Sequence, residues 1–255
     1  MKNLKLSVFL LTVPLLLAGC ESVENKEGFF YSTFVRPMDW TLNTFGELFN
    51  GSYGLAIIAI ILIIRLVLMP FMLKTYRSQA TMKVKMDTVR PQMEDIQARL
   101  KAAKTPEERM TVQQEMMSLY KEHNINPLNM GCLPALIQMP IIMGLYYAIL
   151  YSAEIKTHSF LWFDLGSTDI WMTAIAGIVY FIQAKVSLQT VPEAQKNQMK
   201  LMIYVSPIMI VIISLSSMAA LPLYWAVGGL FLIVQTFIGR KFFSNIPETK
   251  GNESK

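Results

Sequence analysis

The stretch LAIIAIILIIRLVLMPFML, residues 55–73, decides the class of fold, because it is an apolar run of helical length with one charge, Arg65. About 20 apolar residues let a helix cross the hydrocarbon core of a bilayer. The whole chain agrees: 53% of its 255 residues are hydrophobic and 16% are charged, whereas soluble domains carry roughly 25% charged residues. The sequence therefore predicts an integral membrane protein and argues against a freely soluble enzyme.

Four more apolar blocks follow, which predicts an all-α protein with five transmembrane helices. Their expected ranges, the first included, are 54–73, 131–151, 170–186, 201–218 and 222–240. A tight turn at Pro222 is expected to join the last two spans into a hairpin. The strictly apolar parts of the third and fifth blocks, Ile170–Ala184 and Leu223–Ile238, hold only 15 and 16 residues. These two spans therefore look short for a full crossing.

The N-terminus predicts a lipoprotein signal peptide over residues 1–19. Lys2 and Lys5 precede a short apolar run, which ends in Leu16-Leu17-Ala18-Gly19-Cys20. This string resembles the lipobox of bacterial lipoproteins, which implies N-palmitoyl and S-diacylglycerol groups on Cys20. The alternative is an ordinary secretory signal that happens to contain a cysteine.

The distribution of charge predicts the orientation. The segments 74–129, 185–200 and 240–255 hold 17 lysine and arginine residues, whereas segments 20–53 and 152–169 hold three against eight acidic residues. Because basic loops stay on the cytoplasmic side, the sequence predicts a multi-pass protein of the bacterial plasma membrane. Its N-terminus is expected outside and lipid-anchored, and its C-terminus in the cytoplasm. The expected outer segments are 20–53 and 152–169, and the expected inner ones are 74–130, 187–200 and 241–255.

Two of the polar segments are themselves expected to be helical. Residues 34–49 carry aromatic and aliphatic side chains at helical spacing (Trp40, Phe45, Leu48 and Phe49). This pattern predicts an amphipathic helix, either lying in the outer membrane interface or packed on the domain. Segment 74–130 contains Thr105-Pro106-Glu107-Glu108, a helix start with a capping box, which predicts an antiparallel helical hairpin. Its apolar positions Met110, Met117, Leu119 and Tyr120 are sparse, which predicts a weak core and a mobile hairpin.

The motifs of enzymes and metal sites are missing from the sequence. It has no phosphate-binding loop, no Gly-x-Ser-x-Gly, no His-Glu-x-x-His, and only two cysteines and two histidines. The five spans contain no Asp, Glu or His, which disfavours a proton-coupled transporter and an intramembrane protease. We therefore expect no catalytic residue, no cofactor and no metal. The net charge of +5 leaves room for a nucleic-acid partner only on the cytoplasmic side, such as a ribosome, and no specific nucleic-acid sequence is expected.

Arg65 is the residue that most needs an explanation. An arginine at the centre of a span costs about 2.5–3.5 kcal/mol on insertion scales, and such residues usually face water or a partner. Since no span offers a carboxylate, Arg65 predicts a hydrated cavity lined by polar groups. Candidates are Gln138, Thr173, Gln183, Ser206, Ser214, Ser216, Ser217, Gln235 and Thr236. The alternatives are that Arg65 reaches an interface and that each polar group makes a helix–helix hydrogen bond.

Taken together, these features resemble the YidC/OxaA family of membrane protein insertases, in particular its lipoprotein members from Gram-positive bacteria. The resemblance is carried by Arg65, the charged hairpin after it, Asn126-Pro127-Leu128, Gly131-Cys132-Leu133-Pro134, Gln138-Met139-Pro140-Ile141, and Leu221-Pro222-Leu223-Tyr224-Trp225. It covers essentially the whole mature chain. The large extracytoplasmic domain of Gram-negative relatives is absent between Cys20 and the first span.

This resemblance implies a five-helix bundle around a hydrophilic groove that is open to cytoplasm and lipid, with Arg65, Gln183 and Trp225 lining it. It also implies a function, the insertion and folding of newly made membrane proteins, and possibly of lipoproteins, alone or beside the Sec translocon. Implied partners are nascent membrane proteins, the Sec translocon, the ribosome or the signal recognition particle pathway, and the lipid bilayer. Two rival functions remain: a small-anion channel or carrier with Arg65 as selectivity charge, and a structural lipoprotein scaffold.

Overall fold

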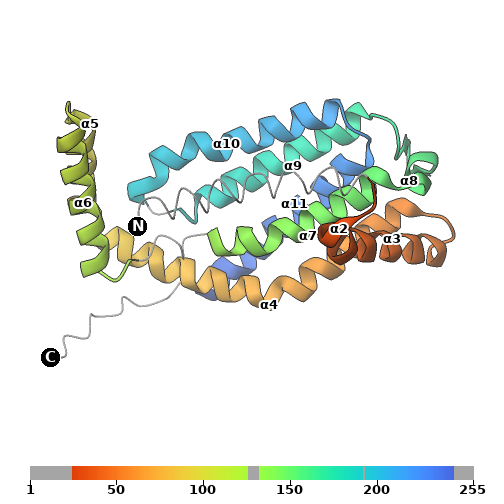
Figure 1. The fold of residues 1–255 in the computed structure, drawn as a ribbon, viewed down its shortest axis with the longest axis horizontal. Helices are drawn as coiled ribbons and strands as arrows, with labels where there is room; N and C mark the ends of the chain where they lie inside the picture. Colours follow the sequence, from red (N-terminus) through yellow and green to blue (C-terminus); the bar gives the residue numbers. More distant parts are fainter. Residues whose placement is uncertain (1–24, 126–131, 192, 244–255) are drawn as a thin grey trace. The chain divides into compact units, whose positions relative to one another are not determined.

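The computed structural model describes residues 25–125, 132–191 and 193–243 (Figure 1). Cys20, the re-entry residues from Asn126 to Gly131 and most of the polar C-terminal tail lie outside these ranges. The described chain divides into two compact units. The first contains residues up to Ile63, Leu136–Thr173 and Ile213–Trp225, and the second contains Ile64–Ala135, Ala174–Ile212 and the residues from Ala226 on.

The described chain is almost entirely helical. The elements are α2 (Gly28–Phe30), a π-helical turn η1 (Tyr31–Val35), α3 (Arg36–Leu48), α4 (Tyr53–Thr88), α5 (Arg90–Ala102), α6 (Pro106–Glu122), α7 (Cys132–Tyr151), α8 (Ala153–Thr157), α9 (Ile170–Leu188), α10 (Glu193–Leu215) and α11 (Ala220–Phe243). Two short strands, β1 (Ser159–Phe160) and β2 (Phe163–Asp164), pair antiparallel between α8 and α9. The all-α membrane class is confirmed, with this small β-hairpin as an unpredicted addition.

Three helices, α4, α9 and α11, are long and apolar enough to cross a membrane. The apolar parts of α7 and α10, Gln138–Tyr151 and Met199–Leu215, are shorter, so the number of five spans stays a prediction.

The expectation that the third and fifth spans are short is wrong, because α9 has 19 residues and α11 has 24. Both helices continue past the charges that end their apolar blocks. α9 runs through Lys185 to Leu188, and α11 keeps Arg240 and Lys241 in its last turn, where cations complement the helix dipole. At the other end α11 begins at Ala220, with Pro222 in its first turn, where proline breaks no helical hydrogen bond.

In the first unit, α3 presents one face to its neighbours and leaves the opposite face open. Leu42 is fully buried, and the ring of Tyr53 fills the space that a Cβ at Gly46 would occupy. Trp40 and Leu48, by contrast, are 68% and 66% exposed. The helix is therefore packed on the domain, and its location in the outer membrane interface stays a prediction that the exposed Trp40 and Leu48 support.

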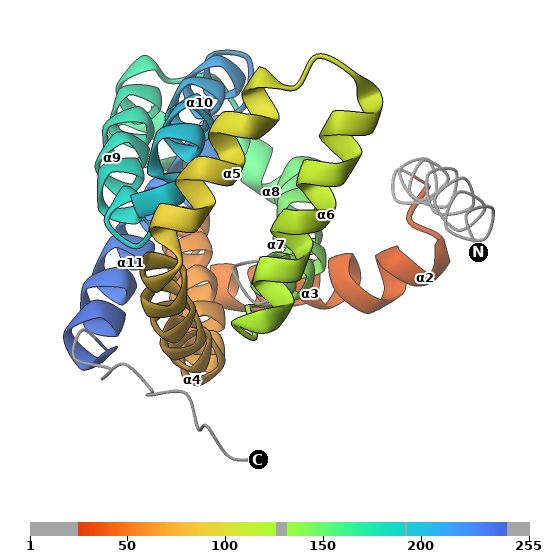
Figure 2. The same ribbon diagram turned by 90° about the vertical axis from the view of Figure 1, so that its left-hand side faces the viewer.

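In the second unit, α5 and α6 lie side by side as an antiparallel pair (Figures 1 and 2). The predicted capping box is confirmed: the Glu108 amide donates to Thr105 Oγ1 at 3.2 Å, and the Thr105 amide donates to Glu108 Oε2 at 3.2 Å. The expected weak core is wrong, because the pair shares a continuous apolar cluster with the end of α4. Its buried members are Met82, Met86, Val89, Met93, Ile96, Val112, Leu119 and Ile125.

Removing the N-cap of α6 is expected to loosen the hairpin. Thr105→Ala should cost about 1 kcal/mol, since an alanine cannot accept the amide hydrogen bond of the first turn. Thr111 is the matched control, because its hydroxyl only donates to the Glu107 carbonyl within the helix. Hydrogen exchange of the α6 amides should accelerate in Thr105→Ala and stay unchanged or slow in Thr111→Ala. Equal exchange in both variants would contradict the capping role.

The same cap should respond to pH. Two backbone amides, of Lys104 and Thr105, donate to the Glu108 carboxylate and hold the pKa of Glu108 below its ordinary value of 4.5. A lowered pKa means that the charged form stabilises the helix start above the ordinary pKa and that this contribution is lost as pH falls through the folded value. Protection of the first turn of α6 should therefore drop on acidification below about pH 4.5. Glu108→Gln should remove this pH dependence, and a persistent acid response in that variant would point to another group.

Candidate functional site

The guanidinium of Arg65 lies against the backbone of α11. A Cβ added at Gly228 would stand 3.6 Å from Arg65 Nη2, an ordinary contact distance, so the guanidinium lies close to α11 at this residue. Arg65 is half-buried, and within the described residues no carboxylate pairs with it. The cation therefore sits inside a helix packing region without a neutralising partner.

Glycines bring α4, α9 and α11 close together in the second unit. A Cβ at Gly229 would meet Val179 Cγ1 at 2.7 Å and the Tyr180 ring at 3.2 Å, and a Cβ at Gly239 would meet the Tyr76 ring at 2.8 Å. Small residues of this kind let membrane helices approach closely. α11 thus packs on α9 through one glycine and on α4 through another.

The two long helices α4 and α11 run parallel with a constant register. Arg65 faces Gly228, and eleven residues later Tyr76 faces Gly239. Eleven residues are close to three full helical turns, so Arg65 and Tyr76 lie on one face of α4. The phenol of Tyr76 shares a hydrogen bond of 2.9 Å with the Thr236 hydroxyl. Because α4 continues unbroken beyond the apolar run, Gln79 and Lys83 fall on the same face as Arg65.

A cavity of about 140 Å³ opens beside this polar stripe. Gln183 of α9 lines it, and its Nε2 donates to Ser187 Oγ at 2.9 Å. The remaining lining residues come from α4, α9, α11 and the turn after α9 (Met72, Thr75, Tyr76, Gln79, Ser187, Thr190, Leu232 and Thr236).

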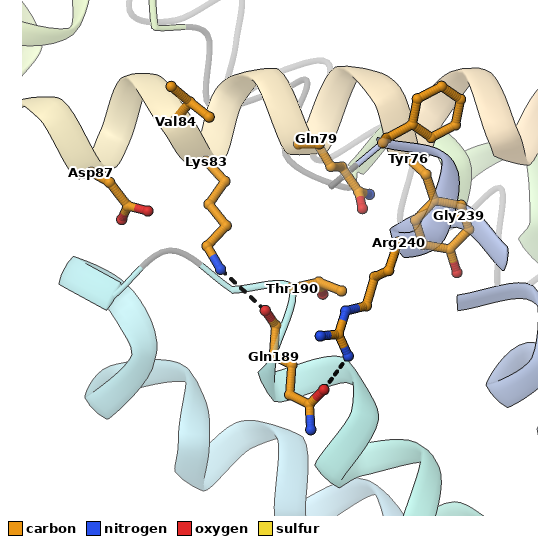
Figure 3. A pocket seen from close by; sticks show the side chains of 11 residues that line it. Tyr76, Gln79, Lys83, Val84, Asp87, Gln189, Thr190, Gly239 and Arg240 are labelled. Carbon is orange, nitrogen blue, oxygen red and sulfur yellow. Dashed lines mark hydrogen bonds between the residues drawn. The ribbon is translucent and has the colours of Figure 1, made fainter. Parts of the chain in front are cut away.

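A second cavity of about 300 Å³ adjoins the first, because both are lined by Tyr76, Gln79 and Thr190. Figure 3 shows how the turn after α9 is held there from two sides. Lys83 Nζ donates to the Gln189 carbonyl at 3.1 Å, and Arg240 Nη1 donates to Gln189 Oε1. A carboxylate, that of Asp87, also lines this cavity, and its Oδ1 accepts a hydrogen bond from the Glu193 amide at 3.3 Å. The two cavities form one polar groove of α4, α9 and α11, here called the groove.

Gln235 of α11 is a buried polar residue whose side-chain amide has no hydrogen-bond partner among the described residues. Its side chain is 1% exposed, and neither Nε2 nor Oε1 has a hydrogen-bond partner among the described groups. Seven residues separate it from Gly228, which places both on one face of the helix. A buried amide without partners is costly, and this one lies on the face of α11 that meets Arg65.

The predicted residues fall into three groups. Gln183 and Thr236 line the smaller cavity, whereas Arg65 and Gln235 lie on the helices of the groove but line neither cavity. Thr173 only donates to the Asp169 carbonyl in its own helix at 2.9 Å, and Ser206 and Ser216 are exposed. Trp225 belongs to the first unit and is half-buried, and Gln138, Ser214 and Ser217 also belong to that unit.

Sequence reasoning missed Tyr76, Gln79, Lys83 and Arg240 as lining residues. Hydropathy ends the first span at residue 73 and separates residues 74–130 from it, although the helix continues across this boundary. The helical period from Arg65, with residues 11, 14 and 18 positions further on, is the signal that finds the first three.

Two glycines of α11 offer a matched test of this packing. Gly239→Ala places a methyl group 2.8 Å from Tyr76 Cγ and should displace the ring from Thr236, at a net cost of about 1–3 kcal/mol. Gly228→Ala meets only ordinary contact distance at Arg65 and should stay within about 1 kcal/mol of wild type. Thermal unfolding in detergent, followed by circular dichroism, measures both. Equal midpoints for the two variants would contradict the close approach at Gly239.

Comparison with known proteins gives the family. Residues 44–246 match the family model described as 60Kd inner membrane protein. Relatives called membrane protein insertase YidC, from Staphylococcus haemolyticus (strain JCSC1435), Staphylococcus carnosus (strain TM300) and Staphylococcus aureus (strain JH9), are 46%, 47% and 47% identical to this chain. These matches cover 97%, 96% and 96% of this chain and 88%, 87% and 88% of the relatives. The resemblance to the insertases is thereby confirmed, and the chain belongs to the 60Kd inner membrane protein family.

Proposed function

We propose that this protein inserts newly made membrane proteins into the bilayer and that the groove of α4, α9 and α11 receives the polar part of the substrate. The names of the relatives support the activity. The observation that carries the role of the groove is Arg65, a cation inside a packed helix region with no carboxylate partner among the described residues. A charge kept there at a cost is explained if an acidic substrate segment completes it.

The mechanism follows from the balance of two environments. The leading, polar part of a substrate meets hydroxyl, amide and guanidinium groups in the groove, so it crosses without losing all of its hydrogen-bond partners. The apolar segment of the same substrate partitions into lipid, which contributes about 25 cal/mol per Å² of apolar surface removed from water. Insertion is then thermodynamically favourable once the barrier for the polar part is lowered, so the proposed mechanism needs no ATP and no ion gradient.

The cations Lys83 and Arg240 add positive charge to one end of the groove. They line the larger cavity at the far end of the α4 stripe. At 1.5 Å rise per residue, Lys83 lies about 27 Å beyond Arg65 along α4, and Arg240 lies about 18 Å beyond Gly228 along α11. Asp87 partly offsets them. An acidic segment that enters at this end meets positive charge again at Arg65, which favours its movement along the groove.

The remaining assignments belong to the same proposal. Trp225 is assigned to the substrate path, Cys20 to lipid attachment, and the α5–α6 pair to the capture of substrates or of their delivery from the ribosome, the signal recognition particle pathway or the Sec translocon. The exposed methionines Met110 and Met117 of α6 support a capturing role, since flexible thioethers adapt to varied apolar partners. The charge distribution supports a cytoplasmic C-terminus.

Substitutions of Arg65 separate charge from shape. In liposomes that contain only this protein, Arg65→Ala should lower the insertion of a single-span substrate with an acidic leading segment by about tenfold, or about 1.4 kcal/mol of lost attraction. Arg65→Lys should retain most of the activity, and a substrate with a neutral leading segment should be less affected. Unfolding midpoints in detergent control for folding.

The same vesicles separate insertase from anion channel. Insertion without leakage of an encapsulated anion supports the proposal. Anion flux that depends on Arg65, together with wild-type insertion by Arg65→Ala, would overturn it in favour of a channel.

Gln235 gives a test in which stability and activity move in opposite directions. Gln235→Met keeps the side-chain length and removes the unpartnered buried amide, which should raise stability by about 1–3 kcal/mol. If the amide serves the polar path, the insertion of acidic substrates should fall in the same variant. Ser214→Ala is the matched control, because Ser214 Oγ is also buried without a partner but belongs to the first unit. Wild-type insertion by the Gln235→Met protein would exclude the amide from the path.

A further inference from the structure

The small β-hairpin of the first unit ends in an exposed apolar tip. Phe160 pairs with Phe163, so the two residues between them, Leu161 and Trp162, form the turn. Their side chains are 74% and 54% exposed. Two-residue hairpin turns are normally built from asparagine, aspartate and glycine, so a Leu-Trp turn is an unusual choice.

The base of the hairpin is held firmly. Phe163 and Leu165 are buried, and the ring of Phe160 occupies the space that a Cβ at Gly54 would need. The amide of Ala220 donates to the Leu165 carbonyl at 3.1 Å. The tip therefore projects from a fixed base and is not a loose loop that folds back on the protein.

Leu161 is also strained. Its φ is +56°, a left-handed conformation in which the Cβ of an ordinary residue crowds the following carbonyl oxygen. Asparagine or glycine would relieve this strain and keep the turn. The chain thus accepts a backbone cost and a hydration cost at one residue, and both are explained if the tip lies in an apolar phase.

The position of the hairpin indicates which phase this is. Gly54 and Ala220, which hold its base, belong to the first turns of α4 and α11, two of the helices able to cross a membrane. The third, α9, begins at Ile170, only eight residues after Trp162, and its first turn exposes Ile170 and Trp171. The N-terminal ends of such helices lie at the membrane surface, where tryptophan is enriched.

We propose that the Leu161–Trp162 tip inserts into the interfacial layer of the bilayer at the N-terminal ends of α4, α9 and α11. Its partner is lipid, not a protein. The fixed base transfers the position of the tip to the starts of α4 and α11, so the tip sets the depth and tilt at which these helices enter the membrane. This inference stands apart from the insertase activity and from the groove.

Fluorescence of Trp162 tests the proposal. The full-length protein, with Trp40, Trp171 and Trp225 changed to phenylalanine, is reconstituted into phosphatidylcholine vesicles that carry bromine near the top of the acyl chains. Most of the Trp162 emission should be lost to the brominated lipid, and iodide on both sides of the membrane should quench little. Trp162 that iodide quenches freely and brominated lipid does not would overturn the proposal and leave a protein partner as the occupant of the tip.

A second variant isolates the leucine. Leu161→Asn in the same background keeps a residue that tolerates positive φ and removes the apolar side chain. Lipid quenching of Trp162 should decrease and iodide quenching should increase, with unchanged helix content by circular dichroism. Unchanged quenching by both agents would show that the Leu161 side chain does not anchor the tip in the bilayer and would overturn its assigned role.

Discussion

An unneutralised cation inside a membrane helix is the constraint on which the rest of this molecule depends. Arg65 sits in the middle of the apolar run 55–73 of α4, and no described carboxylate offsets its charge. Such a residue is tolerated only where polar surroundings or water reach it. In the second unit the guanidinium lies at ordinary contact distance from Gly228 of α11, and a polar cavity lined by Tyr76, Gln183 and Thr236 lies further along the same helices. We therefore propose that the polar surface of α4 and α11 serves both to accommodate Arg65 and to receive substrate.

Helix continuity turns that single charge into an extended polar surface. α4 runs for 36 residues without interruption, although its sequence changes from apolar to highly charged at Lys74. The helical period therefore aligns Arg65 with Tyr76, Gln79 and Lys83 on one face. α11 runs parallel to it with glycines in register, so the stripe is covered on one side and open to cavities on the other. The geometry of this polar surface follows from two unbroken helices and a few small residues.

The class of fold, the capping box at Thr105 and the family could be predicted from the sequence, because each rests on local composition or on short motifs. Helix lengths could not, since hydropathy marks where an apolar run ends and not where backbone hydrogen bonding ends. Hydropathy therefore underestimates the lengths of α9 and α11. The core of the α5–α6 pair is underestimated for a related reason: its apolar cluster draws on Met82, Met86 and Val89, which lie outside the pair. Contacts between distant segments, such as Arg240 with Gln189, leave no local pattern.

The most direct test of the central claim places a photoreactive amino acid on α9 and asks what it meets during insertion. Position 183 lines the groove, and position 178 is the control, because Ile178 is 61% exposed on another face of the same helix. An arrested substrate with an acidic leading segment is exposed to both proteins in membranes. We predict that position 183 crosslinks to the polar leading segment and that position 178 does not. Crosslinks to that segment from position 178 alone would contradict the claim that the groove carries the polar part of the substrate.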